Sequence, residues 1–246
     1  LKNVRNCTMT KISKVLVLGS SGLVGHGISS YLIKKNFLIV GTSNKKKIES
    51  TNKKLKIYNN IDLSKKNSFL KINSIIKSHK IQAVVHSCAL IPNKKKYKKQ
   101  NFISDSIKIN SFSFFNLINI CEKNNIKFLI NISTPNIERL NFDNFREDHN
   151  FYIYTKFLAE KIFKDYSKSK VKLISLRIKS PYGYVLDTKA VIPSFINSIK
   201  KNMKLNLKGN INKPQVFTFS EDIGSACLNI FKKNASGIIN CVGEEF

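Results

Sequence analysis

Three glycines between a predicted strand and a predicted helix constrain this chain more than any other feature. Residues 15–18 form a short apolar run typical of a buried strand, and a helical pattern begins at Leu23. Gly19, Gly22 and Gly25 stand at the junction. At this spacing the first glycine permits a tight turn, the second lets a pyrophosphate approach the backbone, and the third lets the helix pack on the strand. Because the 246 residues include only ten glycines, this spacing favours a dinucleotide-binding loop over an ordinary turn.

The rest of the chain alternates strands with helices. We expect strands at residues 37–40, 83–86, 128–132 and 172–177, and helices at residues 23–35, 65–78, 104–123, 152–167 and 192–200. This alternation predicts a Rossmann-type, doubly wound parallel α/β sheet that is covered on both faces. Because it stops after Pro181, we expect a dinucleotide-binding domain over residues 10–178 and a small substrate lobe over residues 179–246, with elements that return to the main domain.

The formal charge of +28 raises nucleic acid as a partner. Arginine occurs only at positions 5, 139, 146 and 177, so lysine supplies 39 of the 43 basic residues. Nucleic-acid surfaces rely on the forked contacts of arginine, and these lysines are spread along the whole chain. The charge therefore indicates a global compositional bias, and we expect no nucleic-acid partner.

The cysteines and the apolar runs limit the setting of the protein. The five cysteines form no CxxC pair, which argues against a metal site or a disulfide framework and favours a cytoplasmic location. No apolar stretch approaches the ~20 residues that a membrane span needs. We therefore expect no metal and no membrane association.

The end of the second predicted strand bears on which dinucleotide binds. An acidic residue there would accept a hydrogen bond from the adenosine ribose 2′-OH, but this chain has Gly41, Thr42, Ser43 and Asn44, followed by three lysines. Hydroxyl groups and cations suit a 2′-phosphate, which tilts the prediction from NAD toward NADP. The lysine-rich background is the competing explanation for the same pattern.

A tyrosine and a lysine four residues apart form the candidate catalytic pair. Tyr152 and Lys156 share one face of a predicted helix, where the lysine is expected to lower the pKa of the phenol so that it serves as acid or base. The chain holds two more YxxxK pairs, at residues 31–35 and 166–170. Only Tyr152 lies near the start of a helix that follows a strand ending in the hydroxyl residues Ser133 and Thr134.

Taken in order over residues 12–243, these features resemble the extended short-chain dehydrogenase/reductase family, in its NAD-dependent epimerase/dehydratase group. The matching segments are GSSGLVG (19–25), Asp62–Leu63, VVHSCA ending at Cys88 and Ala89, Asn110, NIST (131–134), YIYTKFLAEK with Tyr152, Lys156 and Glu160, LRIKSPYG, and VFTFSEDIGSA with Asp222. Single motifs of this kind are weak, but this many in order are specific.

The resemblance implies a role for each matching residue. Tyr152 is the expected acid/base, Lys156 binds the nicotinamide ribose, and Thr134 orients the substrate oxygen. The residues implied to bind the cofactor are Gly19, Ser21, Gly22, Leu23, Val24, Gly25, Ser43, Asp62, Leu63, Cys88, Ala89 and Lys156. Thr134, Ser180 and Gln215 are expected at the substrate.

Several positions depart from the family pattern. Residues 135–137 replace the usual YG, Ser180 stands where Asn is usual, and Gln215 stands where many members carry an arginine that grips a nucleotide-sugar phosphate. Typical members also continue beyond Phe246, so we expect either a short variant or a fragment.

We therefore expect an NAD(P)-dependent epimerase, dehydratase or reductase acting on a sugar, with a nucleotide-linked sugar as the first candidate. The alternatives are an NADP-dependent reductase of another small carbonyl compound and a non-catalytic dinucleotide-binding sensor or scaffold. By analogy, a homodimer would form through the helices at 104–123 and 152–167.

Four polar residues outside the catalytic set have structural interpretations. We expect His86 to be a packed strand residue and Arg177 to anchor the core. Glu160 is expected to pair with a cation on its own helix, and Asp222 to cap a helix that begins near Ile223.

Overall fold

The computed structural model describes residues 12–91, 101–140, 148–166, 169–185, 191–204 and 216–243, which form a parallel sheet with helices on both faces. The sheet has seven strands in the order β3-β2-β1-β4-β5-β6-β9, and every pairing is parallel. Its strands are β1 (Lys14–Leu18), β2 (Leu38–Thr42), β3 (Leu55–Tyr58), β4 (Ala83–His86), β5 (Phe128–Ser133), β6 (Lys172–Ile178) and β9 (Gly237–Cys241). The strand order reverses between β1 and β4, which confirms the doubly wound Rossmann-type fold.

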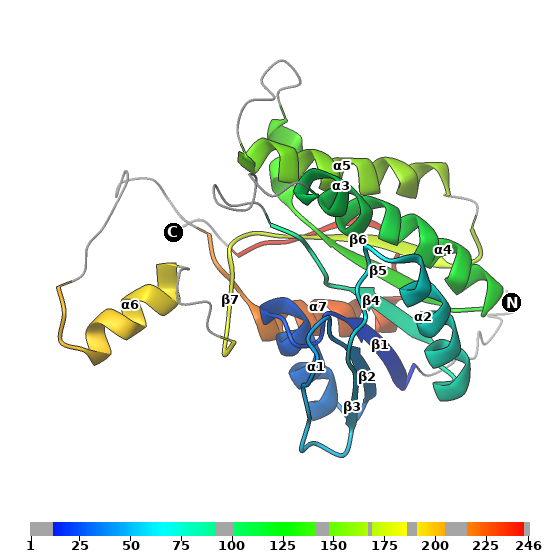
Figure 1. Cartoon of the computed structure of the whole chain (residues 1–246), viewed down its shortest axis with the longest axis horizontal. Helices are drawn as coiled ribbons and strands as arrows, with labels where there is room; N and C mark the ends of the chain where they lie inside the picture. Colours follow the sequence, from blue (N-terminus) through cyan, green and yellow to red (C-terminus); the bar gives the residue numbers. More distant parts are fainter. Residues whose placement is uncertain are drawn as a thin grey trace, which may run out of the picture.

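The helices cover the sheet in two layers (Figure 1). One face carries α1 (Leu23–Lys34) and α7 (Ser220–Lys233), and the other carries α2 (Lys66–His79), α4 (Ser113–Lys123) and α5 (Asp148–Asp165). Alternate residues of β1 serve the two layers: Val15 and Val17 pack with α1 and α7, whereas Leu16 and Leu18 pack with α2 and α4. Burial on both faces explains the uninterrupted apolar run of this strand.

Several elements differ from the sequence prediction. The single helix expected at 104–123 consists of α3 (Phe102–Ile107), a π-helical segment η1 (Lys108–Phe112) and α4. Helix α5 begins at Asp148, four residues before the predicted start. The two edge strands, β3 and β9, were not predicted, because both are short and only partly buried and so lack a continuous apolar run.

The C-terminal part contributes both to the main sheet and to a smaller unit. Strands β7 (Pro181–Tyr182) and β8 (Thr218–Phe219) pair with each other, and α6 (Val191–Lys200) lies apart from the main sheet in Figure 1. Strand β9 belongs to the main sheet, and helix α7 packs against that sheet. The boundary between residues 178 and 179 stays a prediction.

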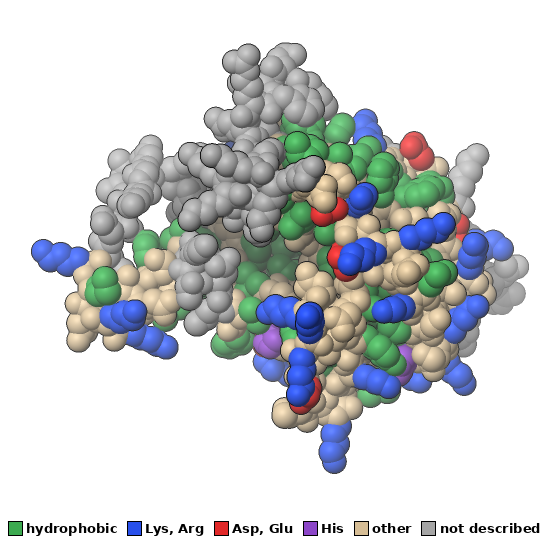
Figure 2. Space-filling model, in the orientation of Figure 1, with side chains coloured by type: hydrophobic (Ala, Val, Ile, Leu, Met, Phe, Trp, Pro, Cys, Tyr) green, Lys and Arg blue, Asp and Glu red, His purple; other side chains and the backbone are tan. Residues whose placement is uncertain are grey.

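The surface agrees with a general lysine bias. On the face seen in Figure 2, the basic side chains are scattered among polar and apolar ones. Among the described helices, none is long and apolar enough to cross a membrane.

Candidate active site

The glycine loop lies at the carboxyl end of β1, where the strand order reverses. Gly19 has a φ of +79°, and its carbonyl accepts a 2.9 Å hydrogen bond from the amide of Gly22. A Cβ on Gly25 would lie 2.2 Å from the Gly19 carbonyl oxygen and 2.6 Å from the Ser87 hydroxyl, so no side chain fits there. At the exposed Gly22 a Cβ would meet only that carbonyl, at 3.4 Å. The turn and the close packing fit the first and third glycine roles, and the open position at Gly22 fits the second.

Helix α1 begins directly after this loop, with Leu23 and Val24 in its first turn. Its N-cap is Gly22, which offers no side-chain cap, and its first turn holds no acidic residue. The first amides of a helix lack partners within the helix and carry the positive end of its dipole. This end of α1 is therefore suited to a phosphate group.

The loop after β2 places two hydroxyl groups beside the glycine turn. Ser21 Oγ donates a 3.0 Å hydrogen bond to Ser43 Oγ, which also accepts the amide of Lys45 at 3.1 Å. Ser43 is buried, whereas residues 44–47 with their three lysines are exposed. Ser43 therefore joins the two loops, and exposed cations follow it.

Asp62 and Leu63 precede α2. The Asp62 carboxylate accepts hydrogen bonds from the amide of Ser64 at 3.0 Å and from its hydroxyl at 2.8 Å, and Leu63 is buried in the core. Asp62 thus stabilises this turn. Whether Asp62 and Leu63 also contact an adenine stays a prediction.

The loop after β4 lies against the glycine loop. A Cβ on Gly19 would come within 2.8 Å of Cys88 Sγ, and Ser87 Oγ donates to the Leu18 carbonyl at 2.6 Å. Burial raises the pKa of the Cys88 thiol to about 12. The sequence-based reasoning missed Ser87, although it stands within the VVHSCA segment.

Asn110, on the π-helical segment, holds this second loop in place. Its side chain accepts from the Leu90 amide at 2.8 Å and donates to the Leu90 carbonyl and to Thr155 Oγ1, both at 3.0 Å. The exposed Ala89 is thereby fixed beside α5. Irregular helical turns of this kind occur frequently at functional sites.

The candidate catalytic pair lies at the carboxyl end of β5. Lys156 is buried; its Nζ donates to the Ile132 carbonyl at 2.9 Å and lies 5.9 Å from the centroid of the Tyr152 ring. Burial lowers the pKa of Lys156 to about 8 and raises the pKa of Tyr152 to about 12. The lowering of the phenol's pKa that we expected from Lys156 is not seen, because the shift of Tyr152 comes from burial.

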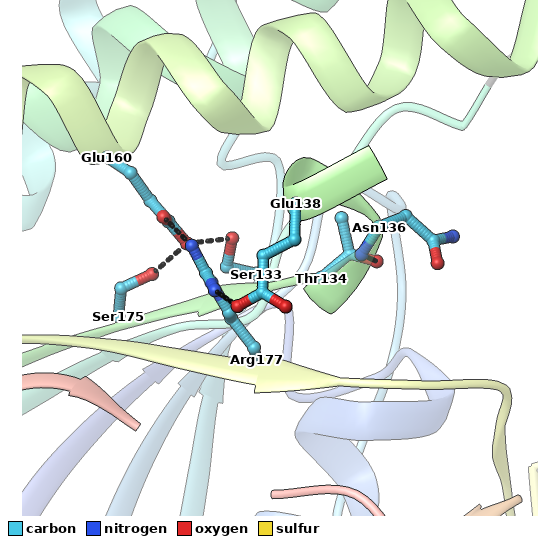
Figure 3. A network of polar contacts seen from close by, with 7 residues as sticks. All are labelled: Ser133, Thr134, Asn136, Glu138, Glu160, Ser175 and Arg177. Carbon is cyan, nitrogen blue, oxygen red and sulfur yellow. Dashed lines mark hydrogen bonds and ion pairs between the residues drawn. The ribbon is translucent and has the colours of Figure 1, made fainter. Parts of the chain in front are cut away.

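The two neighbouring hydroxyl residues at the end of β5 have different partners. Ser133 Oγ donates to Glu160 at 2.8 Å, inside the buried network drawn in Figure 3. Thr134 is the N-cap of the 3₁₀ helix η2 (Pro135–Arg139), and its hydroxyl oxygen accepts a long 3.3 Å bond from the Asn136 amide. This arrangement favours Thr134 as the substrate-facing hydroxyl, although that role remains a prediction.

Arg177, on β6, lies between two carboxylates (Figure 3). Its Nε and Nη2 donate to the two oxygens of Glu160 at 3.0 and 2.8 Å, and its Nη1 donates to Glu138 of η2. The anchoring role of Arg177 is confirmed. The expected partner of Glu160 was wrong, because the cation comes from a neighbouring strand and not from its own helix.

The predictions for His86 and Asp222 had opposite outcomes. His86 is fully buried, with Nδ1 3.1 Å from Asn131 Oδ1 and Nε2 2.8 Å from Ser113 Oγ, and burial lowers its pKa to about 3. Its packing role is confirmed. Asp222 does not cap α7: the helix begins at Ser220 after the N-cap Phe219, so Asp222 lies inside the first turn, where its charge favours the helix dipole.

The two residues predicted at the substrate from the C-terminal part remain untested. Ser180 is exposed between β6 and β7, with a φ of +42°. Gln215 lies outside the described residues. Within the described ranges, no three His, Cys, Asp or Glu side chains group as metal ligands would.

Comparisons with known proteins agree with this geometry. The chain is 24% identical to the dTDP-D-glucose 4,6-dehydratase of Dictyostelium discoideum, over 96% of this chain and 59% of that protein. It is 25% identical to the dTDP-4-dehydro-6-deoxyglucose reductase of Escherichia coli, over 87% of this chain and 71% of that protein. The chain thus spans less than two thirds of the length of the first of these relatives.

Solved structures match the fold. The UDP-glucose 4-epimerase of Thermotoga maritima superposes with a TM-score of 0.78 at 18% identity, over 95% of this chain and 78% of that one. The UDP-N-acetylglucosamine 4-epimerase of Methanobrevibacter ruminantium gives 0.77 at 22%, over 96% and 78%.

A family model covers almost the whole of the described sheet. It is that of the NAD dependent epimerase/dehydratase family, and it matches residues 15–242, from the first strand to the residue after the last one. The glycine loop, the reversal of strand order beside it and the Tyr152–Lys156 pair agree with this match, and the chain belongs to the NAD dependent epimerase/dehydratase family.

Proposed function

We propose that this protein is an NAD(P)-dependent enzyme that epimerises, dehydrates or reduces a nucleotide-linked sugar. The observation that carries the proposal is the placement of Tyr152 and Lys156 one turn apart on α5, with Lys156 tied to Ile132 at the carboxyl end of β5. Ligands of doubly wound sheets bind at this edge. The two curated relatives are named as a dehydratase and a reductase of dTDP-linked sugars, which supports the substrate class.

The residues at the carboxyl ends of β1 and β4, where the strand order reverses, fit a dinucleotide. The amides at the start of α1 would hold its pyrophosphate, and the space at Gly22 admits the close approach. Ser43 and Asp62 would serve the adenosine part, and Lys156 the nicotinamide ribose. When bound, the cofactor supplies the hydride transfer.

Ser43 and the three exposed lysines that follow it favour NADP over NAD. Thermal shift with each cofactor tests this preference, because the tighter ligand raises the melting temperature more. A larger shift with NAD would refute it.

The protonation states define what the side chains can do. With a pKa of about 12, Tyr152 carries its proton at neutral pH and can donate it to a carbonyl oxygen. Lys156, with a pKa of about 8, is mostly charged at pH 7 and places its positive charge beside the tyrosine. Thr134 would hold the same substrate oxygen by a hydrogen bond.

We also propose a homodimer formed through α4 and α5. Four large apolar side chains on α3, η1, α4 and α5 are exposed: Ile103, Phe112, Phe115 and Leu158. Exposed apolar groups on adjacent helices suit an interface between copies. Light scattering should give twice the chain mass, and Phe112→Glu should halve it; a wild-type monomer at high concentration would refute the dimer.

A cytoplasmic location is part of the same proposal. The four cysteines within the described residues are free thiols, and Cys121 and Cys227 are fully buried. Free thiols fit a reducing compartment.

Tyr152→Phe tests the proposed activity. Wild-type protein is assayed with dTDP- and UDP-linked sugars, with NAD and with NADP, and the variant with whichever pair turns over. Loss of the hydroxyl should lower kcat by about 10² to 10⁴, the usual contribution of acid–base catalysis, while cofactor binding stays intact. Tyr154→Phe, two residues away on the same helix, is the matched control. Equal turnover by Tyr152→Phe and wild type would refute the assignment.

A further inference from the structure

Arg177 makes contacts that the common basic residue of this chain cannot reproduce. Only four of the 43 basic residues are arginine. The planar guanidinium of Arg177 donates in three directions, twice to Glu160 and once to Glu138. A lysine ammonium lacks this planar fork. The geometry at this position therefore depends on holding two carboxylates at once.

The two carboxylates differ in how far they need the arginine. The Glu160 side chain is 6% exposed, and it already neutralises the guanidinium through a bidentate pair. The Glu138 side chain is 61% exposed, so water could solvate it without Arg177. Because an exposed ion pair contributes little to stability, charge balance does not explain the Glu138 contact.

Glu138 belongs to a short element with few other restraints. The 3₁₀ helix η2 is five residues long, and the hydrogen bonds of such helices have poor geometry. It begins after its N-cap, Thr134, and Ile137 is its one buried residue. The contact from Glu138 to Arg177 gives η2 a second attachment, four residues after Thr134.

Glu160 connects the same guanidinium to the catalytic helix. It stands four residues after Lys156 and eight after Tyr152 on α5, so the three side chains lie along one side of the helix. Its carboxylate also accepts from Ser133 on β5 at 2.8 Å and from Ser175 on β6 at 2.7 Å. Arg177 is thereby fixed relative to α5, β5 and β6.

We propose that Glu138 is a positioning residue: through Arg177 it fixes the turn that presents Thr134 relative to the helix that presents Tyr152 and Lys156. Figure 3 shows the chain of contacts from Glu160 through Arg177 to Glu138. The effect on catalysis rests on the proposed function, whereas the restraint on η2 does not. Loss of the contact should loosen Thr134 without unfolding the protein, because Arg177 keeps Glu160.

The test combines amide hydrogen exchange with kinetics in the full chain. The variants are Glu138→Ala, Glu138→Gln, which keeps an acceptor oxygen, and the control Glu122→Ala. Glu122 is exposed at the C-terminal end of α4, which leads into the opposite end of β5. Exchange is followed in peptides that cover residues 131–140, with peptides from α7 as an internal reference.

In Glu138→Ala the amides of η2 should exchange about tenfold faster, while those of α7 are unchanged. Turnover should fall about tenfold through kcat, with KM for the dinucleotide within about twofold, since a small misplacement beside the reacting atoms is costly. Glu138→Gln should recover part of both effects, and Glu122→Ala should match wild type.

Each other outcome overturns a defined part of the proposal. Unchanged exchange in η2 refutes the restraint, whatever the kinetics. Faster exchange with unchanged kcat refutes the positioning role and leaves a structural contact. If wild-type protein turns over no nucleotide sugar, the proposed function fails, and exchange alone still decides the restraint.

Discussion

Lys156 and Arg177 are both buried cations, but their charges are compensated in different ways. Both cations are buried near the carboxyl ends of β5 and β6. Arg177 contacts two carboxylates, and within the described part of the chain Lys156 forms no ion pair and donates to a backbone carbonyl. The hydrogen bonds that Arg177 donates to Glu160 raise the pKa of Arg177, whereas burial lowers the pKa of Lys156 to about 8.

This difference indicates that the charge of Arg177 mainly maintains the structure, whereas the charge of Lys156 is available for function. A paired guanidinium has its protonation fixed, so its charge is constant at any pH that the fold survives. An unpaired buried ammonium is held at a free-energy cost and can respond to a ligand beside it. The comparison therefore predicts that variants of Arg177 lower stability most, whereas variants of Lys156 lower activity without lowering stability.

The largest expected effect comes from Arg177→Leu. Removing the guanidinium leaves the buried Glu160 without its cation, which should lower the free energy of unfolding by about 3–5 kcal/mol. Urea denaturation followed by circular dichroism measures the loss. Arg139→Leu, at an exposed position of η2, is the control and should stay within about 0.5 kcal/mol of wild type.

The double variant Arg177→Leu/Glu160→Leu sharpens this prediction. Buried ion pairs replaced by apolar groups are often neutral in stability, so the second substitution should restore most of the loss. A double variant as unstable as Arg177→Leu would show that the packing of the guanidinium, and not the stranded carboxylate, dominates.

A smaller effect of opposite sign is expected for Lys156→Met. Because the ammonium is buried without an ion pair, its replacement should raise the free energy of unfolding at pH 7 by about 1–3 kcal/mol. The same substitution should abolish turnover. Equal losses of stability for Lys156→Met and Arg177→Leu would break the comparison.

The stability gain of Lys156→Met should depend on pH. The pKa of Lys156 falls from 10.5 to about 8 on folding, so between these values the unfolded chain binds the proton that the folded protein has lost. Wild-type stability therefore gains from this group as pH rises, with a slope of at most about 1.4 kcal/mol per pH unit. The advantage of the variant should be largest below pH 8 and shrink toward pH 10.5. Using the difference between the two proteins cancels the opposing titrations of groups that do not interact with Lys156, such as Cys121 and Cys227.

The features predicted correctly from the sequence are those that depend on local patterns. The glycine spacing indicates a tight turn and a close contact between the start of helix α1 and that turn, and both involve residues within seven positions of each other. The buried strands appear as apolar runs because both faces of the sheet are covered. These two signals together gave the Rossmann-type fold and the position of the cofactor loop.

The features that were missed depend on partners far apart in the chain. Glu160 meets Arg177 across 17 residues, and Arg177 meets Glu138 across 39, so no helical spacing reveals either pair. Ser133 and Thr134 both carry a hydroxyl group, so the sequence does not distinguish them. The structure shows that the side chain of Ser133 faces Glu160. The rise in the pKa of Tyr152 was also missed, because desolvation depends on packing that the sequence does not show.

The smallest effect is expected from the two serines that serve Glu160. Ser133→Ala and Ser175→Ala each remove one of the three donors to the same oxygen, so each should lower the free energy of unfolding by about 1 kcal/mol. Because Arg177 keeps its contacts to Glu138 and Glu160 in both variants, each should keep kcat within about twofold of wild type, whereas Thr134→Ala should lose most of it. Thermal unfolding and steady-state kinetics on the same samples make the measurement. A Ser133→Ala variant that loses turnover as fully as Thr134→Ala would place Ser133 at the substrate and contradict its assignment to the network around Glu160.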